Sequence, residues 1–444
     1  MHLSTSTTLG LLTLVLALFP HALAAQTSRI MAGGKQTPGI PVLAVASDGN
    51  AASLRWKADA EDTASESTVV RWGHPAILPS EEVLLLQSGR LRVDTLSITK
   101  DHLQIGDASG LDQLPWKTTS LSRTAVRGIL FQPPGNRREQ FRLLTEIGSQ
   151  DRPQDILLLK NGSRLSGTLL SKSPASDAPG GDSVFQLVLK ADEKPLSIPA
   201  DRVVAWLASG NSEATPIDSA ALGWLGFADG SLLHVQSAET FPKRSGKETP
   251  WQGLRLSLTD SSTLLFTFER PIATHQSLEN EIVYVEPHLS SVKRLGPPLT
   301  PQYKYVPWLS TPASADKTWP YVWNAGLLGD ELNVKKKLYR TGLAMHSASR
   351  TIFEVEPGHK QFVTELGIED SAASQGSVAG QILLQRPTGK WETVSRPIVV
   401  RQGEAPQLIV VPLGDAVRIT LVIDFADQGD IGDHAVWLDP RFEK

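Results

Sequence analysis

Three stretches of the chain repeat the same order of apolar and polar positions. They begin at Val83, Asp155 and Leu222 and read "VLLLQSGRLRVDTLSI", "DILLLKNGSRLSGTLL" and "LGWLGFADGSLLHVQS". Each has an apolar run, a polar turn with glycine, and a second run that alternates, which is typical of a strand with one buried face. Asn161–Gly162 and Asp229–Gly230 are typical of tight hairpin turns, because glycine readily adopts positive φ. The pattern therefore predicts three β-hairpins.

The first two stretches also end alike, in "TTSLSRTAVRGILFQPP" and "PLSIPADRVVAWLAS". Both endings read as a strand, a short polar turn and a closing strand. Self-similarity at this scale indicates tandem small modules. We expect one or more β modules over residues 41–134, a second at 151–212 and a third at 218–290. Between the first two, residues 135–150 hold the best helix candidate, interpreted as a connector, with a basic interaction helix as the alternative.

The N-terminus has the pattern of a secretory signal peptide. An apolar core from Leu9 to Phe19 is followed by the small-residue site Ala22–Ala24, so we predict a signal peptide over residues 1–25. A buried N-terminal helix is the alternative. Residues 26–40 are then expected to be a linker. The signal peptide predicts export to the periplasm or the extracellular space. No later segment is a candidate membrane span, so the mature chain is expected to be soluble.

Charge and cysteine content narrow the function classes. The net charge is -4 and the pI about 6.2, which gives no electrostatic argument for binding nucleic acid or an anionic membrane. The chain has no cysteine, which excludes disulfides, thiolate chemistry and cysteine-ligated metals. An exported protein of this kind must be stabilised by its buried core.

After a Pro-rich segment, "RLGPPLTPQYKYVP", the chain carries an ordered set of short motifs. They are a Gly-x-x-x-His-Ser strand, a Gly-Ile-Glu-Asp-Ser turn, a Gly-Ser-Val strand and a closing Asp-x-x-x-x-Gly-Asp-His-Ala-x-Trp segment. The residues are Gly342, His346 and Ser347; Gly367, Ile368, Glu369, Asp370 and Ser371; Gly376, Ser377 and Val378; and Asp427, Gly432, Asp433, His434, Ala435 and Trp437.

This order resembles the NPCBM family of carbohydrate-binding modules over about residues 305–444. The resemblance implies a galactose-binding-like jelly-roll β-sandwich, which we place at residues 300–444. Alternating strands such as "AVRITLVIDFA" agree with it. The predicted fold class is therefore all-β, with tandem small β-barrel-like modules followed by this sandwich. Two positions depart from the family pattern, namely Glu369 in place of the usual Asp and Val436 in place of an acid.

Sandwiches of this type bind ligands through loops at one end. The candidate ligand-binding residues are His346, Asp370, Asp433, His434 and Trp437. A Trp face can stack on a sugar ring while acids and His bind its hydroxyls. The alternatives are that His346 is a satisfied structural histidine, that Trp437 belongs to the core and that His434 caps a strand end.

Two further hypotheses are a calcium site and a catalytic dyad. Asp427, Asp430 and Asp433 lie three apart on a Gly-rich loop, and oxygen ligands of this kind suit calcium, with solvated turn acids as the alternative. We expect no other cofactor. A direct His346–Ser347 catalytic dyad is not expected, because neighbouring strand residues point to opposite faces.

No G-x-S-x-G, H-E-x-x-H or P-loop motif occurs in the chain, so the protein is not expected to be an enzyme. The expected function is carbohydrate binding through the C-terminal sandwich, with galactose-type or other glycans as partners. The alternative is a cell-envelope scaffold that binds other envelope proteins and whose sandwich has lost sugar binding, as Val436 would allow.

Overall fold

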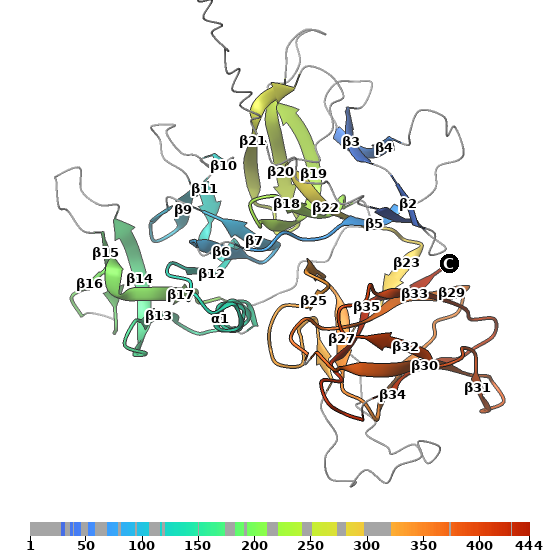
Figure 1. The fold of residues 1–444 in the computed structure, drawn as a ribbon. Coiled ribbons are helices and arrows are strands. Elements are labelled where there is room, and N and C mark those ends of the chain that lie inside the picture. Colours follow the sequence, from blue (N-terminus) through green and yellow to red (C-terminus); the bar gives the residue numbers. More distant parts are fainter. Residues whose placement is uncertain are drawn as a thin grey trace, which may run out of the picture.

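A computed structural model describes most of the chain after residue 68 and four short strands before it. The described residues are 28–31, 36–38, 40–45, 52–57, 69–78, 81–93, 96–105, 116–117, 120–149, 151–173, 183–190, 193–210, 221–241, 251–272, 281–296, 321–372, 374–427 and 429–444. They form antiparallel β-structure with a single α-helix (Figure 1), which confirms the predicted all-β class. The predicted signal peptide lies outside the described residues. None of the described helices is long and apolar enough to cross a membrane.

The three predicted hairpins are present. They are β6 (Val83–Leu86) with β7 (Gly89–Arg92), β13 (Asp155–Leu159) with β14 (Arg164–Ser173), and β18 (Gly223–Phe227) with β19 (Leu232–Phe241). Gly162 and Gly230 have φ of 82° and 91°. The expected reason for glycine at these two turns is therefore confirmed.

In each module the last strand returns to pair with the first. The closing strands are β12 (Val126–Leu130) on β6, β17 (Val203–Leu207) on β13, and β22 (Ile282–Pro287) on β18. Short 3-10 turns, η1 (Arg123–Ala125) and η2 (Ala200–Arg202), precede the first two. The intervening strands are β8 (Leu96–Ile98), β9 (His102–Ile105) and β11 (Ser120–Ser122); β15 (Val184–Val188) and β16 (Leu196–Pro199); and β20 (Trp251–Leu258) and β21 (Thr263–Ile272).

The modules also pair with one another, so they share one apolar core. β12 pairs with β17, and β7 pairs with β19. β10 (Trp116–Lys117) adds to the edge of β21. There Trp116 is almost fully buried between Phe227 and Phe266, and its indole N–H donates to Asp229 Oδ2 over 2.6 Å.

The segment 26–40, expected to be a linker, contains two strands. β1 (Ser28–Met31) pairs with β2 (Gln36–Pro38) and with β5 (Val69–Gly73). β3 (Ile40–Val45) follows and pairs with β4 (Ala52–Lys57). The expectation failed for 28–31 and 36–38 because β1 depends on pairing with a strand far along the chain, which its Ser-rich and Gly-rich composition does not reveal.

The helix α1 (Arg137–Ser149) lies between β12 and β13, within the segment where the sequence predicts a connector. The Asn136 side chain accepts hydrogen bonds from the backbone N–H groups of Arg138 and Glu139 at its start, an N-cap arrangement. Its apolar face packs on strands of modules 1 and 2; that face consists of Leu143, Leu144 and Ile147. The arginines of its first turn are left exposed.

The C-terminal region is a two-sheet sandwich (Figure 1). One sheet contains β24 (Val322–Trp323), β27 (Gly342–Met345), β35 (Ala435–Glu443), β29 (Gln361–Ile368) and β33 (Gln407–Pro412). The other contains β28 (Ser349–Glu354), β34 (Arg418–Phe425), β30 (Ser377–Gln385), β31 (Trp391–Thr393) and β32 (Ile398–Arg401). A small hairpin, β25 (Asn333–Val334) with β26 (Lys337–Leu338), follows β24. Apolar side chains from both sheets form the core between them.

The sandwich is joined to the preceding modules by β23 and by buried charges. β23 (Val292–Arg294) comes before the Pro-rich segment, yet it pairs with β35 in the sandwich. Arg71 of β5 bonds to Glu365 of β29, and Arg294 Nε donates to Asp439 Oδ1 over 3.0 Å. Arg340 donates to Glu286 of β22 over 3.0 Å. These charges are buried or nearly so.

The pKa shifts at this junction favour the charged forms. Burial alone would lower the pKa of Arg71, but Glu365 and Asp439 raise it further than burial lowers it. Burial likewise would raise the pKa of Asp439, and the surrounding arginines hold it below its usual range. Each ion thus depends on its partner, because an unpaired buried charge is costly.

Candidate functional site

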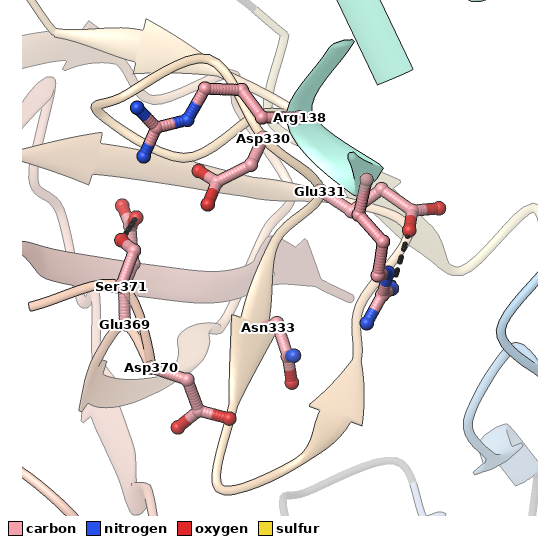
Figure 2. A pocket seen from close by; sticks show the side chains of 8 residues that line it. Arg138, Asp330, Glu331, Asn333, Glu369, Asp370 and Ser371 are labelled. Atoms are coloured by element: carbon pink, nitrogen blue, oxygen red, sulfur yellow. Dashed lines mark hydrogen bonds and ion pairs between the residues drawn. The ribbon is translucent and has the colours of Figure 1, made fainter. Parts of the chain in front are cut away.

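A polar pocket of about 230 Å3 lies where one end of the sandwich meets the N-terminus of α1 (Figure 2). Three segments build it: the first turn of α1, the stretch leading into β25, and the turn after β29. The lining residues are Arg137, Arg138, Asp330, Glu331, Asn333, Glu369, Asp370 and Ser371. All eight are polar and none is aromatic. Such a lining suits a ligand rich in hydrogen-bonding groups.

Glu369 is the buried carboxyl of this pocket, with 2% of its surface exposed. Its Oε1 accepts from the Leu327 backbone N–H and its Oε2 from the Ser371 hydroxyl, both over 2.9 Å. Burial raises the pKa of Glu369 to about 7, and Asp330 adds to the increase, while the two hydrogen bonds oppose it. The carboxyl therefore changes its charge near neutral pH.

Gly326 allows the two carboxyl groups to approach. A Cβ at position 326 would lie 2.4 Å from Asp330 Oδ1 and 2.5 Å from Glu369 Oε2, so any side chain there would push them apart. Asp330 Oδ1 is buried and accepts no hydrogen bond from the described residues. The charge of Asp330 contributes to the raised pKa of Glu369.

Asp370 has a structural role at the edge of the pocket. Its carboxylate oxygens accept from the backbone N–H groups of Lys335 and Lys336, over 2.7 and 2.6 Å. Both lysines have positive φ, 51° and 61°, and they form the turn between β25 and β26. Asp370 thus holds this turn, and through it Asn333, at the pocket wall.

The two arginines of α1 differ in their partners. Arg137 Nη2 donates to Glu331 Oε2 over 2.8 Å, and Glu331 Oε1 also accepts from Arg90 of β7 over 3.0 Å. This three-residue bridge ties the pocket wall to module 1. Arg138 has an exposed side chain, and Figure 2 shows it beside Asp330 on one side of the pocket.

The predicted ligand residues His346, Asp433 and His434 gather at the same end of the sandwich. The rings of His346 and His434 are 6.1 Å apart. Burial lowers the pKa of both histidines and so favours their neutral forms. Burial raises the pKa of Asp433, whose Oδ1 accepts from the Ser377 backbone N–H over 3.2 Å. Asp433 is 1% exposed, so it supports the loop from inside.

His346 and Ser347 lie beyond the end of β27, so the strand rule used against a dyad does not apply to them. The Ser347 hydroxyl lies 3.3 Å from His346 Nδ1. Both residues are buried, each 6% exposed. Neither lines the described pocket, and the contact is between chain neighbours. It does not by itself define a catalytic site.

Trp437 lies in the sandwich core. It is 0% exposed and packs with Leu343, Leu366 and other core residues. No face of its ring is open for a sugar to stack on. The structure thus supports the core interpretation of Trp437 and not its placement as a ligand contact.

Position 436 bears on the scaffold alternative. Val436 is fully buried under the β25–β26 hairpin, against Leu332 and Val334. The side chain at this position does not line the described pocket. The family's missing acid at this position therefore gives no reason, in this chain, to infer lost binding.

Two of the three acids proposed for calcium, Asp427 and Asp433, have partners of their own. Asp427 bonds to Arg401, whose Nη2 is 2.6 Å from Asp427 Oδ2. Asp433 is buried and bonded to the Ser377 backbone, as described above. Within the described ranges, no group of three His, Asp or Glu side chains is placed to hold a metal ion.

Most of the pocket was not predictable from the sequence. Asp370 was predicted, and Glu369 and Ser371 stood in the same motif. Arg138, Asp330, Glu331 and Asn333 were not identified. Arg138 had one available signal, because it belongs to the basic start of the predicted helix. The others have no local pattern, because a tertiary contact brings them together.

Comparison with known families assigns the sandwich. The family model described as NPCBM/NEW2 domain matches residues 305–443, and the N-terminal region is not assigned to a family. The chain therefore carries an NPCBM/NEW2 domain in its C-terminal third, as the motifs predicted. None of the curated proteins compared matches the chain.

Several solved structures are similar. One is CBM51 from Clostridium perfringens GH95 in complex with methyl-galactose: 17% identity, 28% of this chain and 89% of that chain covered, TM-score 0.25. Another is the tandem CBM51 modules of a Streptococcus pneumoniae family 98 glycoside hydrolase: 11% identity, 67% and 90% covered, TM-score 0.27. At TM-scores this low, these likenesses carry no argument about the chain.

The pKa of Glu369 leads to a prediction about stability. The folded chain binds a proton on Glu369 more tightly than the unfolded chain does. The protonated Glu369 therefore contributes stability that is fully present at low pH. It is lost as the pH rises from the ordinary value of 4.5 through about 7. Glu369→Gln keeps the group neutral. The unfolding free energy of Glu369→Gln minus that of the wild type should increase by on the order of 2 kcal/mol between about pH 5 and about pH 8.

Urea denaturation across this pH range measures the effect. Glu354→Gln is the matched control, because Glu354 is exposed on β28 and pairs only at the surface with Arg418. Its difference from the wild type should stay constant with pH. A constant difference for Glu369→Gln as well would show that Glu369 is ionised throughout.

Proposed function

We propose that this protein is an exported carbohydrate-binding protein without catalytic activity, and that it binds sugar in the pocket between the sandwich and α1. The NPCBM/NEW2 domain supports the ligand class. The signal-peptide pattern at residues 1–25 supports export. The observation that carries the proposal is the pocket itself, because it lies at one end of this domain and is lined by polar groups alone.

The chemistry of the lining matches hydroxyl groups. A hydroxyl both donates and accepts a hydrogen bond. Asp330 offers acceptors, Arg138 offers donors, and Asn333 offers both. A volume of about 230 Å3 leaves room for a single sugar ring. Because no aromatic side chain lines the pocket, hydrogen bonds must supply most of the affinity.

A glycan array probed with the full chain tests this function, followed by calorimetric titration of the best glycan. Asp330→Asn should weaken binding about tenfold or more, because a hydrogen bond to a charged group contributes about 1.5–3 kcal/mol. Asp415→Asn is the control, because Asp415 is exposed and does not line the pocket. This variant should bind as the wild type does. A folded chain that binds no glycan on the array would overturn the proposal.

A further inference from the structure

The pocket is composite: one of its walls belongs to the N-terminal region. Arg137 and Arg138 belong to α1, which lies outside the residues matched by the NPCBM/NEW2 model. The opposite wall consists of Glu369, Asp370 and Ser371 from the sandwich. A sandwich considered alone would therefore present an open acidic surface where the whole chain has a pocket.

The position of α1 relative to the sandwich is fixed by contacts on several sides. The helix packs through its apolar face on the strands of modules 1 and 2. Those modules are tied to the sandwich by the buried pairs Arg71–Glu365 and Arg294–Asp439. At the pocket itself, Glu331 bonds to Arg90 and Arg137 together. The first turn of α1, which carries Arg138, is thus held at a defined place beside the acidic wall.

The charges of the lining indicate which sugars fit. Glu331 already neutralises Arg137, since the two are 2.8 Å apart. Arg138 then remains as the single cation of the lining without an ion-pair partner among the described residues. Figure 2 shows it beside Asp330, and Glu369 and Asp370 belong to the same lining. A hydroxyl can accept from Arg138 and donate to Asp330 at once. The carboxylate of a uronic acid can also accept from Arg138, but the acidic side chains of the lining repel it.

We infer that the acids of the pocket make it select a neutral pyranose with adjacent hydroxyl groups over the corresponding uronic acid, and that Arg138 is a specificity-determining residue because its charge sets how strongly the pocket discriminates between the two. This inference rests on the proposed function and extends it. It assigns part of the recognition to the N-terminal modules, which then have a role beyond spacing the sandwich from its surroundings.

The test uses the full chain with four variants and two ligands. The ligands are the best neutral monosaccharide from the array and its uronic acid, and the readout is the dissociation constant of each. Arg138→Ala should weaken neutral-sugar binding about tenfold. The dissociation constant of Arg138→Lys for the neutral sugar should lie between those of the wild type and Arg138→Ala, because an ammonium keeps the charge but lacks the planar fork of a guanidinium. Arg142→Ala removes an exposed arginine from the same helix outside the pocket and should match the wild type. Arg138→Glu should bind the uronic acid least of all.

The ratio of the two dissociation constants separates specificity from structure. In Arg138→Ala the uronic acid should lose more affinity than the neutral sugar, because the one attractive charge is gone and the acids remain. Equal losses for both sugars, or equal behaviour of Arg138→Ala and Arg142→Ala, would overturn the inference while leaving sugar binding intact. A wild-type chain that binds neither sugar and no glycan on the array would instead overturn the proposed function.

Discussion

A fragment of residues 301–444 is expected to be unstable, although it contains the whole segment matched by the family model. The cut removes β23, and with it a strand that hydrogen-bonds to β35. It also removes Leu295, which belongs to the sandwich core. The fragment therefore has an unpaired edge and an open core at the same place.

The same cut leaves buried charges without partners. Glu365 loses Arg71, and Arg340 loses Glu286. Breaking a buried ion pair costs about 3–5 kcal/mol, and a whole domain is stable by only about 5–15 kcal/mol. Exposure of the junction to water reduces this cost, but the losses together approach the stability of the domain.

Thermal and urea denaturation followed by circular dichroism measure this prediction. A fragment of residues 281–444 keeps β22, β23 and Leu295 and is the matched control; we expect it to unfold cooperatively at a higher midpoint. Adding Glu365→Gln to the shorter fragment should restore part of the difference, because it removes an unpaired charge. Equal midpoints for the two fragments would show that the sandwich does not depend on the junction.

Replacing Trp437 with alanine should destabilise the whole sandwich rather than remove a ligand contact. The ring is fully buried, and its edge packs closely over Gly380: Cη2 and Cζ2 lie 3.2 and 3.4 Å from where a Cβ of that glycine would be. A cavity of this size costs about 3–5 kcal/mol. The urea midpoint should fall accordingly, and sugar binding should fall only with the folded fraction.

Trp391→Ala provides the comparison, because Trp391 on β31 is only half-buried. Its cost should be on the order of 1 kcal/mol. If Trp437→Ala instead kept its midpoint and lost sugar binding, Trp437 would be a ligand contact, as the sequence first suggested.

The fold was predictable where the pattern is local. Alternating strands around Asn161–Gly162 and Asp229–Gly230 define hairpins by themselves, because period and turn chemistry act over a few residues. β1 and β23 were not predictable, since each is a strand only through a partner distant in sequence. The junction charges were not predictable either. Arg71, Glu365 and Asp439 stand in ordinary strands, and only tertiary packing brings them together.

The same distinction holds for the pocket. Asp370 was identified through a motif that is contiguous in sequence. Arg138 and Asp330 come from different regions of the chain, so no spacing rule connects them. Trp437 shows the opposite error: an aromatic residue in a motif looks like a ligand platform, but burial decides its role, and burial is not visible in the sequence.

The pairing of first and last strands has a consequence for how such a chain can grow. In each module, the end of the closing strand lies beside the start of the opening strand, as Leu130 lies beside Val83. The polypeptide therefore arrives at and departs from a module at almost the same point. A gene segment encoding one such unit could be copied in tandem without displacing the neighbours' ends. The three similar hairpins in this chain have the geometry that such duplication requires.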